Sequence, residues 1–206
     1  LITESANEKY FDASVQMQRK SKNSYFISDT LSQKISETKN SQGVFAVCKM
    51  KNENISLKTN QKYIALDNLQ DPGNLGTVIR TAEALGISSV IVGGGCDVFN
   101  PKVLRASMGS VLRLDVFECQ SLAPVLQKAK SLGIKTYATS PDSSAKKINE
   151  TQFPKSSLCV IGNEANGVSD EVMNICDETV TIPMLGRAES LNAHVAGAIV
   201  MWEMLR

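Results

Sequence analysis

Residues 190–206 constrain the fold more than any other segment, because their sequence is that of an almost wholly apolar helix. The apolar residues fall at helical spacing in two adjacent stripes, one of Val195, Ala198, Ile199, Trp202 and Leu205 and one of Ala193, Ala196, Gly197, Val200, Met201 and Met204. We expect this helix to begin at Ser190, a good N-cap residue that follows a polar loop. A helix of this kind must be covered on most of its circumference.

Three β-leaning segments each run into a polar loop that contains glycine. These are residues 63–69 with loop 70–76, residues 158–162 with loop 163–167, and residues 178–184 with the loop that precedes Ser190. In open α/β sheets, ligands collect beyond the carboxyl ends of the strands. The three loops therefore predict one composite ligand site.

Between these loops the pattern alternates strand and helix. Strands are predicted at 63–69, 90–92, 111–117, 136–139, 158–162 and 179–184, and helices at 77–85, 122–132 and 190–206. Gly86 is expected to end the first of these helices. Such alternation predicts an α/β fold with a mostly parallel sheet and helices on both faces.

The first quarter of the chain has a different organisation. A polar, lysine-bearing stretch at 51–61 is predicted to link residues 1–50 to a larger domain at 62–206. Residues 24–27 and 43–48 favour strands, and Asp29 is expected to cap a short helix. We expect a partial small α/β domain here; the alternative is that these residues extend the fold of the larger domain.

Composition limits the classes of function. Twenty-two basic and 21 acidic residues give a net charge of +1, so any affinity for nucleic acid must come from a local patch. Five cysteines without a C-x-x-C pair favour a reducing cytoplasm and argue against zinc or a disulfide framework. We expect no metal, no membrane span and no visible signal peptide, and we expect the natural chain to start before Leu1.

Three ordered motifs carry a resemblance to a known family. They are Asn74 and Arg80 within 71–81, the loop 162–167, and the segment 182–192 that ends in Ser190-Leu191-Asn192. Over residues 62–206 the chain resembles the SpoU (TrmH) family of SPOUT RNA methyltransferases. The resemblance implies a C-terminal deep trefoil knot, S-adenosyl-L-methionine as methyl donor, and transfer to a ribose 2′-hydroxyl of structured RNA, with rRNA favoured over tRNA. It also implies that residues 1–50 belong to a ribosomal-protein-like RNA substrate-binding domain.

The same resemblance assigns site residues. The catalytic candidates are Asn74, Arg80, Glu164, Ser190 and Asn192, and the cofactor-binding candidates are Gly162, Asn163, Glu164, Ile182, Met184, Leu185, Ser190 and Leu191. From residue type alone, Asn74 and Ser190 could serve only as N-caps. Glu164 is expected to hold the motif loops or Arg80 by hydrogen bonds. No metal ligand is assigned.

Arg80 has two possible roles in the reaction. The family gives the matching arginine a base-like role, yet a guanidinium stays protonated. We therefore favour a clamp on an RNA phosphate that orients or activates the hydroxyl, because Arg80 lies off the apolar stripe of its predicted helix.

A homodimer is expected, built partly on the final helix. Its two stripes exceed what one domain can cover, and Ala193, Ala196 and Gly197 are expected to let a partner approach closely. His194, the one histidine, is interpreted as a packing or interface residue rather than a base.

The sequence leaves two other functions open. A nucleotide-binding oxidoreductase is weakly supported, because Gly93-Gly94-Gly95 lacks G-x-G-x-x-G spacing. A catalytically silent RNA-binding protein of the same fold is the main alternative, although the intact motif residues favour activity.

Overall fold

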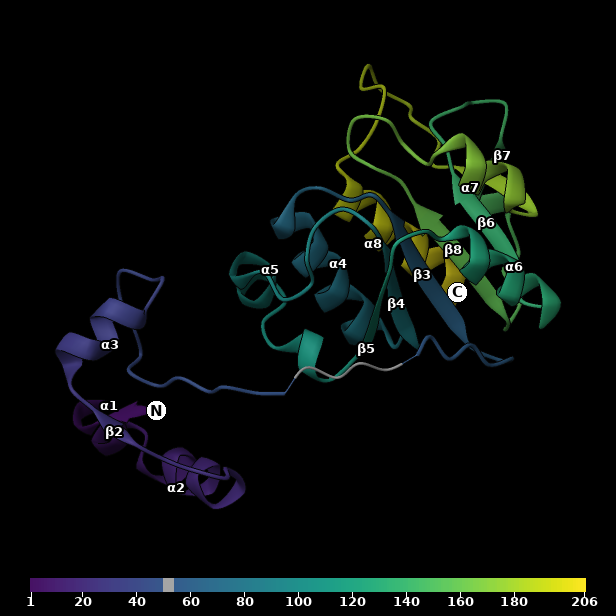
Figure 1. Cartoon of the computed structure of the whole chain (residues 1–206). Coiled ribbons are helices and arrows are strands. Elements are labelled where there is room, and N and C mark those ends of the chain that lie inside the picture. The colour runs from purple at the N-terminus through teal and green to yellow at the C-terminus, as the bar shows by residue number, and fades with distance from the viewer. Residues whose placement is uncertain (50–53) are drawn as a thin grey trace. The chain divides into compact units, whose positions relative to one another are not determined.

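The computed structural model describes residues 1–49 and 54–206, so the first part of the predicted linker, 51–53, lies outside the described residues. The chain divides into two compact units, Leu1–Asn52 and Glu53–Arg206 (Figure 1).

The larger unit is built on a parallel sheet. Its strands are β3 (Lys62–Asp67), β4 (Ser89–Gly93), β5 (Asp115–Cys119), β6 (Lys135–Thr139), β7 (Lys146–Lys147), β8 (Ser157–Ile161) and β9 (Glu178–Thr181). They lie in the order β5-β4-β3-β8-β6-β9-β7, and every pairing among the described residues is parallel. The predicted mostly parallel sheet is confirmed, with the short β7 as an addition.

Helices cover both faces of this sheet (Figure 1). One core contains residues of α4 (Pro72–Leu85), α5 (Pro101–Ala106) and α8 (Ala193–Leu205), and the other contains residues of α6 (Ala123–Ser131) and α7 (Asp170–Ile175). Alternate residues of β3 enter the two cores, Ile64 and Leu66 the first and Tyr63 and Ala65 the second. The prediction of helices on both faces is therefore confirmed.

The helix of the first motif begins earlier than expected, at Pro72 instead of residue 77. The Asp71 side chain accepts a hydrogen bond from the Asn74 backbone N–H at 2.9 Å, and Pro72 presets the first helical φ. Asn74 therefore lies inside the first turn and is not the N-cap. Gly86 ends the helix in the left-handed conformation, at φ 80°, as predicted.

The final helix begins later than expected. Asn192 is its N-cap, and the Asn192 side chain accepts from the His194 N–H at 3.0 Å, so the prediction of a helix starting at Ser190 is wrong. The preceding strand β9 ends at Thr181, before Pro183, which has no N–H to donate.

The predicted strand 111–117 is also shorter than expected, because a 3₁₀ turn, η1 (Ser110–Leu112), precedes β5. A second 3₁₀ turn, η2 (Ile148–Glu150), follows β7. Ile55 and Leu57, in the described part of the predicted linker, pack against the core that contains α6 and α7.

The two stripes of α8 have different environments. Ala193, Gly197, Val200, Met201 and Met204 are buried, while Val195, Trp202 and Leu205 are 38%, 63% and 39% exposed. A Cβ at Gly197 would contact Val78 of α4 at 3.5 Å and Ile161 of β8 at 3.9 Å. Gly197 thus faces the chain's own core, and the expectation that it receives a partner is wrong.

The smaller unit contains β1 (Ile2–Thr3), α1 (Glu4–Lys9), α2 (Phe11–Lys20), β2 (Phe26–Ile27) and α3 (Asp29–Ile35), with β1 and β2 paired in parallel. Ser28, not Asp29, caps α3, because its side chain accepts from the Leu31 N–H at 3.2 Å. The predicted strand 43–48 is wrong, since the segment forms only a single bridge between Val44 and Ile2. Neither α1 nor α2 was predicted. None of the helices in the described ranges is long and apolar enough to cross a membrane.

Candidate functional site

A cavity of about 340 Å³ opens at the carboxyl ends of β6, β8 and β9. This volume is typical of sites for small molecules. Its position follows from the strand order, because the chain adds β4 and β5 on one side of β3 and β6, β8 and β9 on the other. Such a change of direction leaves a crevice at the strand ends.

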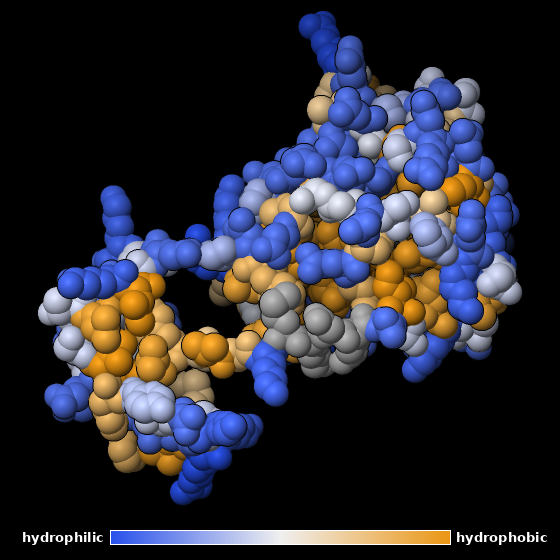
Figure 2. Space-filling model, viewed as in Figure 1, coloured by the Kyte–Doolittle hydropathy of each residue, from blue (hydrophilic) through white to orange (hydrophobic). Residues whose placement is uncertain are grey.

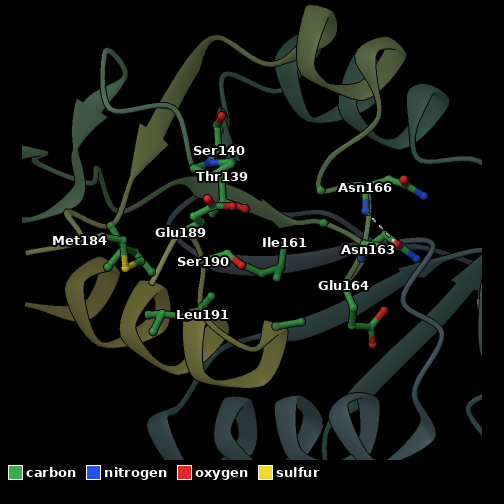
Figure 3. A pocket seen from close by; sticks show the side chains of 17 residues that line it. Thr139, Ser140, Ile161, Asn163, Glu164, Asn166, Met184, Glu189, Ser190 and Leu191 are labelled. Carbon is green, nitrogen blue, oxygen red and sulfur yellow. Dashed lines mark hydrogen bonds between the residues drawn. The ribbon is translucent and has the colours of Figure 1, made fainter. Parts of the chain in front are cut away.

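Most of the predicted cofactor-binding residues line this cavity: Gly162, Asn163, Glu164, Ile182, Met184, Ser190 and Leu191. Figure 3 shows Met184 at one side of the cavity, Asn163 and Glu164 at the opposite side, and Ser190 and Leu191 between them. Leu185 does not line it and is 98% exposed. The second and third motif loops therefore form one cavity, whereas loop 70–76, which the sequence analysis placed in the same site, contributes no residue to its wall.

The loop after β8 has a backbone shape that requires glycine. A Cβ on Gly162 would lie 2.1 Å from the carbonyl carbon of Gly167 and 2.2 Å from the nitrogen of Val168. The loop closes through the Asn163 N–H to Gly167 O at 2.9 Å and the Gly167 N–H to Asn163 O at 3.0 Å, with Gly167 at φ 69°.

Asn163 fixes this loop with its side chain. Its Oδ1 accepts from the backbone N–H groups of Ala165 at 2.9 Å and Asn166 at 3.1 Å, the latter drawn in Figure 3. Its Nδ2 donates to the carbonyl of Asn68 at 2.7 Å, just beyond β3. Asn163 therefore joins the loop of the second motif to the strand that leads into the first.

Glu164 ties the second motif to the first. Its carboxylate accepts from the backbone N–H of Gln70 at 3.2 Å, the backbone N–H of Asp71 at 3.1 Å and Asn74 Nδ2 at 2.9 Å. Desolvation raises the pKa of Glu164, but these hydrogen bonds outweigh it and leave the pKa below its usual value. The expectation that Glu164 holds the motif loops is confirmed.

Asn74 joins the first motif to the final helix. Its side chain is almost fully buried, and its Oδ1 lies 3.0 Å from Nδ1 of His194 in the first turn of α8. Neither Asn74 nor Ser190 is an N-cap, so the reading of these two residues as caps is wrong. Asp71 and Asn192 have that role.

Arg80 lies apart from this network. It follows Asn74 by six residues on α4, which places it about 9 Å farther along the helix and on a different side. Arg80 is exposed, does not line the cavity, and forms no ion pair within the part of the chain that the structure describes. The guanidinium is therefore free to bind an anion from outside this unit.

The sequence missed several residues of the site. Thr139 and Ser140 line the cavity, and Figure 3 shows Glu189 beside them. Thr139 and Ser140 directly follow a predicted strand, so the strand-end rule that selected the other loops could have found them. The contact of His194 with Asn74 had no such signal, because 120 residues separate the pair.

No group of three or more potential metal ligands occurs within residues 1–49 and 54–206. The described cysteines form no disulfide. Burial raises the pKa of the Cys176 thiol to about 12 and also raises that of Cys159, so both thiols are protonated and unreactive at neutral pH.

Comparison with known proteins agrees with this arrangement. The profile of the SpoU rRNA Methylase family matches residues 61–202. The 23S rRNA (guanosine(2553)-2′-O)-methyltransferase RlmP of Bacillus subtilis is 36% identical over 181 residues, covering 87% of this chain and 71% of that protein. The 23S rRNA (uridine(2479)-2′-O)-methyltransferase of Streptomyces viridochromogenes is 34% identical over 148 residues, covering 69% of this chain and 52% of that protein.

Solved structures show the same likeness. A putative RNA methyltransferase of the TrmH family from Porphyromonas gingivalis superposes with a TM-score of 0.80 at 32% identity, covering 92% of this chain and 78% of that one. The AdoMet-bound rRNA methyltransferase from Sinorhizobium meliloti superposes with a TM-score of 0.82 at 27% identity, covering 95% of this chain and 77% of that one. The family match, the relatives and the cavity of the second and third motif loops agree, and the chain belongs to the SpoU rRNA methylase family.

Proposed function

We propose that this chain transfers a methyl group from S-adenosyl-L-methionine to a ribose 2′-hydroxyl of ribosomal RNA. The observation that carries the proposal is the cavity formed by the second and third motif loops. Glu164 of the second motif joins this cavity to the first motif by accepting a hydrogen bond from Asn74. Two curated relatives are named as 23S rRNA 2′-O-methyltransferases, and two solved relatives are described as bound to AdoMet.

The cavity suits this donor chemically. Ile161, Ile182, Met184 and Leu191 provide apolar surface for an adenine ring. Polar groups of Ser140, Glu189, Ser190 and the backbone of the loop 162–167 surround the same space and can bind ribose and the charged amino acid part. S-adenosyl-L-methionine supplies an electrophilic methyl on a sulfonium, and the protein must hold it in line with the acceptor oxygen.

The acceptor side is assigned to the first motif. Asn74 is hydrogen-bonded to Glu164, which lines the cavity, and from this position the Asn74 amide can orient a hydroxyl. Ser190 on the cavity wall and Asn192 at the start of α8 complete the predicted catalytic set. Arg80 is assigned to an RNA phosphate, because its free planar guanidinium matches a phosphate in geometry and charge.

Dimerisation is assigned to the exposed stripe of α8. Val195, Trp202 and Leu205 leave apolar side chains on the surface of a helix whose other stripe is already buried. Aromatic residues of this kind are enriched at interfaces. A second copy is the proposed occupant, in keeping with the family resemblance.

Three further features are proposed from the resemblance. A C-terminal trefoil knot is inferred from the family resemblance alone. The unit Leu1–Asn52 is assigned to RNA binding as part of a ribosomal-protein-like domain, and the cytoplasm is assigned as the location because the described cysteines are unpaired.

The test combines donor binding and methyl transfer. Calorimetry should show that the chain binds S-adenosyl-L-methionine with equal affinity with and without EDTA. Incubation with rRNA and a methyl-labelled donor should then place the label in RNA. Donor binding without transfer to any rRNA would support the catalytically silent RNA-binding alternative instead.

A further inference from the structure

His194 has one hydrogen-bond partner in the site that its sequence position did not suggest. Its Nδ1 lies 3.0 Å from Oδ1 of Asn74. The backbone N–H of His194 is held by the Asn192 side chain, so the histidine sits in a fixed first turn of α8. Its neighbours Ala193 and Ala196 line the cavity.

The orientation of the Asn74 amide follows from its other partner. An ionised carboxylate only accepts hydrogen bonds, and Glu164 already accepts from the N–H groups of Gln70 and Asp71. The group that Asn74 turns toward Glu164 must therefore be its donor, Nδ2, at 2.9 Å. Figure 3 shows the Glu164 side chain extending from its loop away from Ser190.

This orientation leaves only one arrangement at the histidine. Oδ1 of Asn74 cannot donate, so Nδ1 of His194 must carry the hydrogen of their contact. In the neutral ring Nε2 is then the unprotonated nitrogen. A carboxylate in the loop of the second motif thus sets the tautomer of a histidine on the final helix, through an amide on α4.

We propose that His194 is a positioning residue for methyl transfer, which holds the Asn74 amide in one orientation from the side opposite Glu164. The inference rests on the proposed function, because it takes Asn74 to be part of the catalytic site. A side-chain amide whose Oδ1 and Nδ2 are both held by hydrogen bonds cannot flip and exchange the positions of these two atoms. Asn74 therefore presents a constant pattern of donor and acceptor to the acceptor hydroxyl.

The first experiment measures the tautomer without reference to activity. Because the chain has one histidine, ¹⁵N-histidine labelling gives a single imidazole spectrum. Long-range ¹H–¹⁵N correlation of the full chain near pH 8 should show a protonated Nδ1 and an unprotonated Nε2. A protonated Nε2, or an average of the two tautomers, overturns the proposal.

A variant tests the part played by Glu164. Glu164→Ala removes the acceptor that orients Asn74, so the two tautomers should become mixed. Glu171→Ala, which removes an exposed carboxylate of α7 outside the site, is the matched control and should keep the Nδ1–H form. If Glu164→Ala kept the single tautomer, Glu164 would not be its cause.

The second experiment uses three substitutions of His194. In His194→Asn the amide nitrogen can take the place of Nδ1, whereas His194→Gln carries it farther out and His194→Ala removes it. Loss of one oriented hydrogen bond corresponds to about a tenfold change. We expect kcat to fall about tenfold in the Ala and Gln variants and less than about threefold in the Asn variant, with donor affinity nearly constant.

The outcomes separate this inference from the proposed function. If His194→Asn is as slow as His194→Ala, or if His194→Ala is as fast as the wild type, the positioning role is wrong. If the wild type transfers no methyl group, the proposed function fails, while the imidazole spectrum still decides whether the Glu164–Asn74–His194 arrangement exists.

Discussion

Substitution of Gly162 by alanine tests whether the loop 162–167 forms the cavity wall. The new Cβ would lie 2.1 Å from the Gly167 carbonyl carbon and 2.5 Å from its oxygen. These are backbone atoms held by the two hydrogen bonds between Asn163 and Gly167, so no side-chain rotation relieves the clash. The loop must open, which removes a wall of the cavity.

The expected cost is that of overpacking, about 1–3 kcal/mol. For a domain of this size each kcal/mol lowers the melting temperature by about 2–4 °C. Gly162→Ala should therefore melt roughly 2 to 12 °C below the wild type. Affinity for S-adenosyl-L-methionine should fall at least about tenfold, because the misplaced loop carries Asn163 and Glu164 with it.

Gly186→Ala is the matched control for this experiment. Gly186 lies in the third motif segment, and apart from Gly186 itself and its two chain neighbours no described residue has a heavy atom within 4 Å of the added Cβ. Thermal denaturation and donor calorimetry should leave this variant close to the wild type. The reasoning would be refuted if the two variants bound the donor equally well.

Three further predictions address Arg80, Glu164 and the proposed dimer. Arg80→Lys should raise the barrier to transfer by about 2 kcal/mol in single-turnover assays with little change in donor affinity, because lysine lacks the planar fork; equal rates would reject the phosphate clamp. The pKa of Glu164 in the folded chain lies below its ordinary value of 4.5, so the ionised carboxylate stabilises the wild type relative to Glu164→Gln. This difference in the free energy of unfolding should have its full value above pH 4.5 and should be lost as the pH falls through the lower pKa of the folded chain. Urea unfolding of both proteins at a series of pH values measures the difference, and a difference that does not change with pH would contradict the prediction. In sedimentation experiments, Trp202→Glu should shift the chain toward the monomer, whereas Glu171→Gln on α7 should not. If the wild type itself sediments as a monomer, the proposed dimer is wrong.

Much of the larger unit was predictable because its signals are local. Alternating strand and helix patterns predicted the parallel sheet, and motif order predicted the family and its use of S-adenosyl-L-methionine in RNA ribose methylation, which the relatives confirm. The two stripes of α8 were also correct as a pattern. Periodicity could not tell which stripe the core would bury, since both contain small and large apolar residues.

The errors have local causes as well. Ser190 and Asn192 are both good N-cap residues, and which of them caps the helix depends on the path of the loop that follows the end of β9 at Thr181. Asn74 and Asp71 present the same ambiguity at α4. The smaller unit was predicted least well, because its two strands have only two residues each and give almost no periodic signal.

The long-range contacts of the site could not be predicted from the sequence. The Asn74–His194 contact spans 120 residues and the Asn74–Glu164 bond spans 90. Neither spacing carries a pattern that a single chain reveals. The function of Glu164 could be stated only as a choice between the motif loops and Arg80, and the hydrogen bonds favour the loops.

The most direct test of the central claim is a map of 2′-O-methylated nucleotides in rRNA from cells with and without the gene, repeated with the purified chain and labelled S-adenosyl-L-methionine. The account predicts that a ribose 2′-O-methyl group disappears from rRNA in the deletion and is restored at the same nucleotide by the purified chain. An unchanged map, or a label that appears on a base instead of a ribose, would contradict it.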